Sequence, residues 1–285
     1  MEMITNKEKI MSKTILKWAG NKSRVMPAII SHFPKDFNAY VEPFAGALGA
    51  YLNSGIDIIK HPIHLNDVNA EIINLYECIR LDSQRVLNIA NALKRDEASF
   101  YNIRSWDKQP DWKQNYDKWQ QAARTLYLNK QSYNGLYRIN KKGQYNTPYC
   151  QQEKIGDLID NKTLTDFLSM IQNVNFYNED FNKFLLRDFG KNALYYLDPP
   201  YVDINNPERP FDGYQCSFGL KEQESIVQHM SRLSSNGHKV IVSNSYCPKT
   251  VQLYQGFSQH IIQAPRSISS KASSRGMINE ILAIT

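Results

Sequence analysis

The sequence predicts an α/β protein with a mostly parallel sheet that helices cover on both faces. Short runs rich in aliphatic and aromatic residues recur along the chain, and segments of helical character fit between several of them. This alternation is typical of parallel sheets, because each parallel connection needs a crossover segment. Several runs end at proline, glycine or aspartate, which stop a strand and favour a turn.

The expected elements follow from the local pattern of apolar residues. After the first strand, Gly46 and Gly49 indicate a tight turn into a short helix. Apolar residues at helical spacing, such as Ile72, Tyr76 and Ile79, predict an amphipathic helix after the second strand. The predicted strands cover residues 37–44, 63–67, 174–181, 193–201, 238–244, 257–265 and 278–285. The predicted helices cover residues 69–94, 220–235 and 247–255.

The middle of the chain has a different composition. Residues 95–150 are rich in Tyr, Trp, Asn, Gln, Lys and Arg and contain no clean β-run, while residues 126–128 indicate the core of a helix. The sequence therefore predicts an inserted, mainly helical domain over residues 75–158. Residues 1–74 and 159–285 would together form the domain that carries the sheet.

Composition narrows the class of protein. The 285 residues are 42% hydrophobic, which suits one large domain or a core domain with an insert. No apolar run is long enough to span a membrane, so a soluble, cytoplasmic protein is expected. Four scattered cysteines without a C-x-x-C pair, and six histidines without ligand spacing, argue against a disulfide framework and against a metal site. The net charge of +6 permits an anionic partner but does not establish one.

A carboxylate, a rigid turn and an aromatic ring come together at the end of the run over residues 193–197. They belong to the segment Asp198-Pro199-Pro200-Tyr201, whose prolines cannot donate to a sheet ladder and so end the strand. In open α/β sheets, ligands bind at the carboxyl ends of the strands. The segment therefore predicts a binding or catalytic site, the alternative being a simple strand-ending turn with a packed tyrosine.

Three more strand ends carry suggestive groups. Gly46, just after Phe44, would let a backbone approach a ligand closely. Asp67 suits the two hydroxyls of a ribose, or equally the N-cap of the next helix. Asp180 and Phe181 suit the amino group and the ring of an adenine, or again an N-cap and a core residue. Acids without a phosphate-binding lysine indicate a nucleoside-like cofactor that has no phosphates.

The order of the motifs along the chain resembles a known family. They are KWAGNK (17–22), VEPFAGALGAYLN (41–53), LNDVN (65–69), YNGLYRINKKGQYNTP (133–148), DPPY (198–201), VIVSN (240–244) and RSISS (266–270). This series is similar to the Dam family of site-specific DNA adenine-N6 methyltransferases, from about residue 14 to the end. The resemblance implies a Rossmann-like, S-adenosylmethionine-dependent methyltransferase sheet, with residues 75–158 as an inserted target-recognition domain. Asn21 and Leu48 depart from the family's pattern, since each stands where a glycine is often found.

The resemblance also implies a mechanism. Asp198 and the Pro199 carbonyl would accept the two N–H bonds of the target amino group, so that its lone pair points at the methyl group to be transferred. The target base would be flipped out of the duplex, and Tyr201 would stack on it. Pro200 completes this catalytic segment. The implied cofactor-binding residues are Trp18, Ala19, Lys22, Pro43, Phe44, Gly46, Asp67, Asp180, Phe181 and Asp198.

Residues 133–140 predict a polar, aromatic hairpin that enters the DNA. Arg138 suits a bidentate pair with guanine O6 and N7, although charge alone would favour a solvated surface arginine. By resemblance, Tyr133 and Asn134 fill the gap left by the flipped base, and Leu136 and Pro148 touch a thymine methyl. The hairpin's Asn140 completes the set, and Lys17 is implied to contact the first guanine of the target. Together these residues predict recognition of 5′-GATC-3′ in double-stranded DNA.

A basic, hydroxyl-rich loop is expected between the last two strands. It suits contacts to DNA phosphates, which position a protein without reading sequence. A disordered surface loop is the alternative. The residues proposed for these contacts are Arg266, Ser269, Ser270, Lys271 and Arg275.

Three other functions are alternatives to the adenine methyltransferase. The first is methylation of cytosine N4 on the same fold. The second is a catalytically silent DNA-binding protein, against which the intact segment at residues 198–201 argues. The third, an NAD-type dehydrogenase, is disfavoured because no G-x-G-x-x-G follows the first strand. A restriction endonuclease partner or a solitary role, and a monomer or a weak dimer, stay open.

Overall fold

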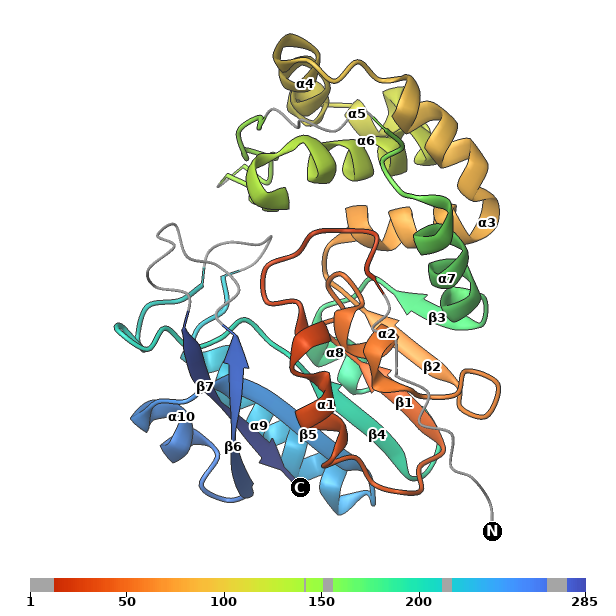
Figure 1. Ribbon diagram of the computed structural model, residues 1–285. Coiled ribbons are helices and arrows are strands. Elements are labelled where there is room, and N and C mark those ends of the chain that lie inside the picture. The colour runs from red at the N-terminus through yellow and green to blue at the C-terminus, as the bar shows by residue number, and fades with distance from the viewer. Residues whose placement is uncertain (1–12, 141, 151–155, 212–216, 266–275) are drawn as a thin grey trace.

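A seven-stranded mixed sheet forms the centre of the computed structural model, which describes residues 13–140, 142–150, 156–211, 217–265 and 276–285 (Figure 1). The strand order is β3-β2-β1-β4-β5-β7-β6. Strands β1 to β5 run parallel, and β7 runs antiparallel to both β5 and β6. The strands are β1 (Ala39–Glu42), β2 (Ile63–Asn66), β3 (Val174–Tyr177), β4 (Ala193–Leu197), β5 (Lys239–Ser245), β6 (Ser258–Pro265) and β7 (Met277–Ile284).

The predicted α/β fold class is confirmed. Each of the seven predicted runs overlaps one strand, although most strands are shorter than their runs. β4 ends at Leu197, because the prolines that follow Asp198 cannot continue the ladder. β3 ends at Tyr177, since Asp180 already caps the next helix.

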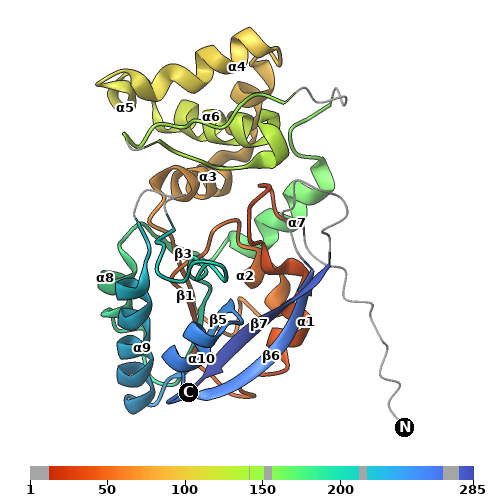
Figure 2. The same cartoon turned by 90° about the vertical axis from the view of Figure 1, so that its left-hand side faces the viewer.

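The two faces of the sheet bury different sets of side chains. Along β4, Leu194 and Tyr196 pack into one apolar cluster, and Tyr195 and Leu197 pack into the other. This alternation is what a strand produces when both of its faces are covered. In Figure 2, α8 and α9 lie on one side of the sheet, and α1 and α2 lie on the other.

The helices that cover the sheet are α1 (Met26–Ile30), α2 (Gly49–Ser54), α7 (Asn161–Ile171), α8 (Phe181–Leu185), α9 (Leu220–Ser235) and α10 (Pro248–Leu253). The predictions over 220–235 and 247–255 correspond to α9 and α10. None of the helices within the described ranges combines the length and the apolar composition that crossing a membrane requires.

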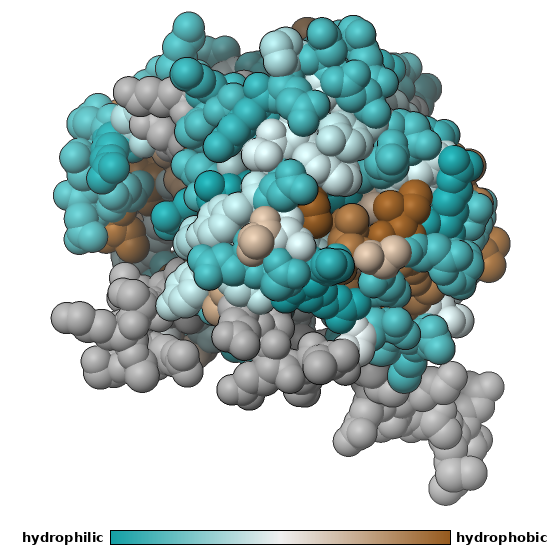
Figure 3. All heavy atoms as spheres, turned by 90° about the horizontal axis from the view of Figure 1, so that it is seen from above, coloured by the Kyte–Doolittle hydropathy of each residue, from teal (hydrophilic) through white to brown (hydrophobic). Residues whose placement is uncertain are grey.

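A group of helices lies beyond the carboxyl edge of the sheet (Figures 1 and 2). It consists of α3 (Ala70–Ala92), α4 (Glu97–Arg104), α5 (Trp112–Asn115) and α6 (Lys118–Gln131). The helix predicted over 69–94 is α3, but Asp82 has non-helical angles and divides it. The domain boundary predicted at residue 75 falls inside α3, which therefore runs from the sheet region into the helical group. Seen from the side of α4 to α6, most of the surface is hydrophilic (Figure 3).

Strand order reverses between β1 and β4, and this positions the site. From β1 the chain adds β2 and β3 on one side, whereas from β4 it adds β5 on the other. Ala39 of β1 pairs with Ala193 of β4, so the two strands end at nearly the same level. A crevice outside the strand ends is expected at such a reversal.

Candidate active site at the carboxyl edge of the sheet

A cavity of about 1170 Å³ opens at this reversal point. The four strand ends that the sequence singled out all contribute to its wall, as do the loop before α1 and the turn after α6. The predicted site residues that line it are Lys17, Trp18, Ala19, Lys22, Pro43, Phe44, Gly46, Asp67, Asn134, Leu136, Asp180, Phe181, Asp198, Pro199, Pro200 and Tyr201. The residues at the four strand ends thus converge because of the sheet topology.

Asp198 is held at both of its carboxylate oxygens. Its Oδ1 accepts a hydrogen bond from the Ser243 hydroxyl at 3.0 Å, and the Tyr196 hydroxyl lies 2.9 Å from that Ser243 oxygen. Its Oδ2 lies 3.0 Å from the Lys22 ammonium. Lys22 is itself only 5% exposed and also donates to the Gly20 carbonyl at 2.8 Å. This carboxylate is therefore fixed in position and faces a buried cation.

Tyr201 is fixed through its hydroxyl group. The hydroxyl donates to Glu280 Oε2 at 2.8 Å, and the Lys22 ammonium lies 4.7 Å from the centre of the ring. Burial, with Asp198 and Glu280 nearby, raises the pKa of Tyr201 well above its ordinary value. Tyr201 thus stays a neutral hydrogen-bond donor at any ordinary pH.

The acid at the end of β2 organises the turn after β1. Asp67 accepts the Gly46 N–H and the Asn69 N–H, both at 2.9 Å, while the Tyr76 hydroxyl donates to the Gly46 carbonyl at 2.6 Å. Burial raises the pKa of Asp67 to about 6, against the effect of the two backbone donors. The N-cap of α3 is Asn69, so the interpretation of Asp67 as that cap is wrong.

Asp180 does cap a helix, since it accepts the Asn182 N–H at 2.9 Å at the start of α8. It is exposed on the cavity side, so capping leaves part of the carboxylate accessible. Phe181 is 6% exposed and packs against Phe44, with ring centroids 5.2 Å apart. The two interpretations of this segment are therefore compatible.

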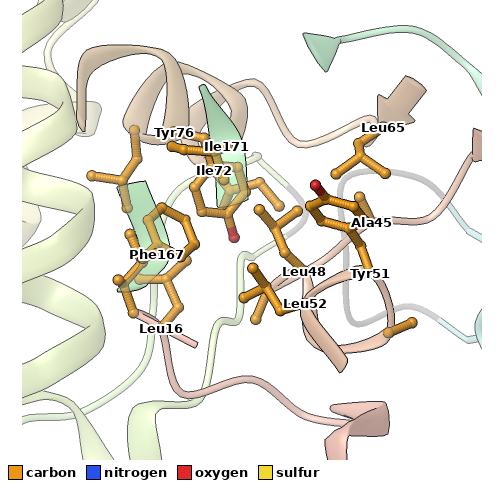
Figure 4. Packing of buried hydrophobic residues seen from close by; sticks show 14 of the residues in the cluster. Leu16, Ala45, Leu48, Tyr51, Leu52, Leu65, Ile72, Tyr76, Phe167 and Ile171 are labelled. Carbon is orange, nitrogen blue, oxygen red and sulfur yellow. The ribbon is translucent and has the colours of Figure 1, made fainter. Parts of the chain in front are cut away.

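The two departures from the family pattern have structural explanations. Leu48 takes the left-handed conformation (φ 63°) that a glycine favours, and its side chain is completely buried. Figure 4 shows it among core residues such as Leu52 and Ile72. The side chain of Asn21 occupies space beside Gly49, where an added Cβ would lie 2.0 Å from Asn21 Oδ1.

The predicted DNA-binding residues fall into two groups, one inside the cavity and one outside its wall. Lys17, Asn134 and Leu136 line the cavity, whereas Tyr133, Arg138 and Pro148 are exposed and lie outside its wall, as does the half-buried Asn140. The buried Asn129, which lies outside the cavity wall, connects the segments of Lys17 and Gly135. Its side chain accepts the Lys17 N–H at 2.9 Å and donates to the Lys17 and Gly135 carbonyls. The residues proposed for phosphate contacts, Arg266, Ser269, Ser270, Lys271 and Arg275, lie outside the described residues.

Sequence reasoning missed three polar residues around the site. Ser243 belongs to the VIVSN motif but was given no role. Glu280 interrupts an apolar strand, and such a carboxylate is a usable signal because burying it needs a partner. Glu42 is 1% exposed and accepts the Tyr40 hydroxyl at 2.9 Å; burial raises its pKa well above the ordinary value. Glu42 stands at the end of an apolar strand, just before Pro43, so the same signal of a carboxylate in an apolar strand was present in the sequence.

Comparison with known proteins finds a matching family and several similar sequences. A family model for D12 class N6 adenine-specific DNA methyltransferases matches residues 18–268. The retron Ec67 DNA adenine methylase of Escherichia coli is 32% identical, covering 95% of this chain and 91% of that protein. The DNA adenine methylase of Salmonella typhi is 30% identical, covering 96% and 95%. The type II methyltransferase M1.LlaDCHI of Lactococcus lactis subsp. cremoris is 28% identical, covering 98% and 97%.

Proposed function

Because the chain belongs to the D12 class of N6 adenine-specific DNA methyltransferases, we propose that it methylates adenine N6 in 5′-GATC-3′, with S-adenosylmethionine as donor. The membership confirms the resemblance to the Dam family and sets the cytosine-N4 alternative aside. The donor, the target sequence, base flipping and the residue roles are the proposal. The observation that carries it is the anchored Asp198, next to Tyr201, in a cavity that also contains Asp67 and Asp180.

The residues of the cavity fit S-adenosylmethionine. When bound, this cofactor supplies an electrophilic methyl group on a positively charged sulfur. Gly46 leaves room beside Trp18, because an added Cβ would lie 3.0 Å from the indole Nε1. Asp67 would accept from the ribose hydroxyls, and Asp180 would accept from the adenine amino group. The same adenine would lie against Phe181.

Asp198 and the Pro199 carbonyl would orient the target amino group. An aromatic amino group is a poor nucleophile, because its lone pair is delocalised into the ring. Two acceptors that take its N–H bonds localise the lone pair and aim it, which is catalysis by positioning and electrostatics. A carboxylate is too weak a base to deprotonate the neutral amine first. Asp198 would receive the proton only after the methyl group has moved.

Base flipping and target recognition would use the surface next to the cavity. The target nitrogen is out of reach inside a stacked duplex, so the base must leave the helix. Asn134 lines the cavity, and Tyr133, its neighbour in the chain, is 50% exposed; these two residues would fill the gap. Arg138 would pair with a guanine of the target, a contact worth roughly 1–3 kcal/mol of discrimination. Lys17 would contact the first guanine of the target.

The decisive experiment uses the purified protein and labelled S-adenosylmethionine. One duplex contains a single GATC, and its partner contains the same bases in scrambled order. Nucleoside analysis should find N6-methyladenine in the GATC duplex only. Equal methylation of both duplexes would keep the reaction and refute the assigned target, while no transfer in either, despite DNA binding, would favour the silent DNA-binding protein.

Base flipping needs a separate measurement. We expect 2-aminopurine at the target adenine to become more fluorescent when the protein binds, because the base leaves the stack. The same fluorophore two base pairs outside GATC serves as the control and should not respond. An equal response at both positions would contradict flipping of the target base.

A further inference from the structure

Glu280 is a buried carboxylate that the proposed mechanism does not use. It lies on β7, where it pairs with Ser245 of β5 and with Ile262 of β6, so strands flank it on both sides. The residue is 6% exposed, and it belongs to the wall of the active-site cavity. Its side chain accepts the Tyr201 hydroxyl at 2.8 Å. A carboxylate held in this way cannot move without disturbing the sheet.

We propose that Glu280 is a positioning residue, which holds the Tyr201 ring in the orientation in which it meets the target base. The inference rests on the proposed function and adds a residue to it. Glu280 does not contact the base itself. It acts through the tyrosine hydroxyl, 79 positions away in the sequence.

The tyrosine ring is restrained at both ends. Its backbone follows Pro199 and Pro200, whose ring-locked φ angles leave the turn little freedom. At the far end, the hydroxyl donates to a carboxyl oxygen that the two flanking strands hold in place. The Lys22 ammonium lies over one face of the ring, 4.7 Å from its centre. The target base would therefore stack on the opposite face.

A purely structural role for Glu280 explains less. Burying a carboxylate inside a sheet costs free energy. Burial raises the pKa of Glu280, whereas the nearby Lys22 and the hydrogen bond from Tyr201 lower it. For stability alone, an apolar side chain would serve β7 better at this position. The acid at this position is therefore accounted for by its partner, because the tyrosine hydroxyl needs an acceptor.

Four variants test the inference by kinetics. Glu280→Leu removes the acceptor, Glu280→Gln keeps an acceptor oxygen, and Tyr201→Phe removes the donor but keeps the ring. Asn279→Leu is the matched control, because this neighbouring residue is exposed and faces away from Glu280 along the strand. Each variant is compared with the unsubstituted protein for kcat, for the KM of S-adenosylmethionine and for Tm.

Loss of this hydrogen bond should lower kcat of Glu280→Leu by roughly five- to tenfold, with the cofactor KM unchanged. Glu280→Gln should recover most of the rate, and Asn279→Leu should keep it. Tyr201→Phe combined with Glu280→Leu should be no slower than the slower single variant, because both remove one interaction. Additive losses, or a loss in Glu280→Leu that follows a lowered Tm or a raised cofactor KM, would overturn the proposal.

A second measurement needs no activity. In protein labelled with fluorotyrosine, the ¹⁹F resonance that disappears in Tyr201→Phe identifies Tyr201. This resonance should shift in Glu280→Leu and stay in place in Asn279→Leu. If no methyl transfer is seen but the resonance shifts as expected, the proposed function fails while the contact stands. If methyl transfer is normal and the resonance does not respond to Glu280→Leu, the proposed function stands and the positioning role is refuted.

Discussion

Substitution of Gly49 by alanine should damage the loop that carries Lys22, although alanine is the better helix former. Gly49 is the first residue of α2, and a Cβ there would lie 2.0 Å from Asn21 Oδ1 and 2.7 Å from Asn21 Cγ. Real side chains do not approach so closely, so the Asn21 side chain must move. The backbone nitrogen of Lys22, 3.3 Å from the same point, limits how far the helix can give way.

The cost can be worked from the contacts that Asn21 would lose. Its Oδ1 accepts the Ser23 N–H at 3.0 Å and the Ser23 hydroxyl at 2.7 Å, and its Nδ2 donates to the Thr14 hydroxyl at 3.3 Å. At about 1 kcal/mol each, these three hydrogen bonds amount to about 3 kcal/mol. Alanine in a helix returns roughly 0.5–1 kcal/mol relative to glycine. We therefore expect Gly49→Ala to lower the free energy of unfolding by about 2 kcal/mol.

A double-mutant cycle with Asn21→Ala tests the reasoning. Asn21→Ala removes the colliding atoms and loses the same hydrogen bonds, so Gly49→Ala should then be neutral or slightly stabilising. Chemical denaturation of the four proteins gives the coupling energy, which we expect to be about 2–3 kcal/mol. If Gly49→Ala costs the same with and without the Asn21 side chain, the assigned collision is wrong.

Three further predictions concern the chemistry. Asp198→Asn should reduce methyl transfer to background while DNA binding is largely kept, because the charged acceptor is lost but the DNA-facing surface is not. A gel-shift titration and the transfer assay measure the two properties, and turnover near the normal rate would contradict the role of Asp198. Arg138→Ala should relax specificity more than it slows transfer at GATC, so rates on duplexes with single-base changes should converge; an equal loss on every duplex would refute this. Because burial raises the pKa of Asp67 to about 6 and the ionised form is the better acceptor, affinity for S-adenosylmethionine should rise with pH and level off above about pH 7. Calorimetry of Asp67→Asn, which does not titrate, is the control, and the same pH dependence in that variant would exclude Asp67 as its source.

Local sequence signals were sufficient for the elements of the sheet. β4 and β5 are strongly apolar runs with clear ends, and the helices α9 and α10 lie where the pattern changes. The divided course of α3 at Asp82 could not be predicted, because aspartate is tolerated on the exposed face of a helix. The short helices α1 and α8 also lack the repeats that reveal an amphipathic pattern.

The site could be predicted where one motif contains the whole feature, as in the segment from Asp198 to Tyr201. Contacts between distant segments could not. Tyr201 and Glu280 are 79 positions apart, and Lys17 and Asn129 are 112 positions apart, so no local pattern connects them. Leu48 shows a different limit of sequence-based prediction. Leucine rarely adopts the left-handed conformation, so its presence argued against such a turn, but burial of the Leu48 side chain stabilises it.

Pairing of β1 with β4 also bears on how the chain reaches its fold. The two central strands join Ala39 to Ala193, and everything between them must be synthesised before they can meet. At roughly 5–20 residues per second, about 8–30 s separate the appearance of β1 from that of β4 during translation. Contacts so distant in the chain are slow to form, because a long loop must close before they bring any gain. During this interval one edge of β1 has no strand to pair with, so nascent protein that stalls before β4 should be the form most prone to aggregate.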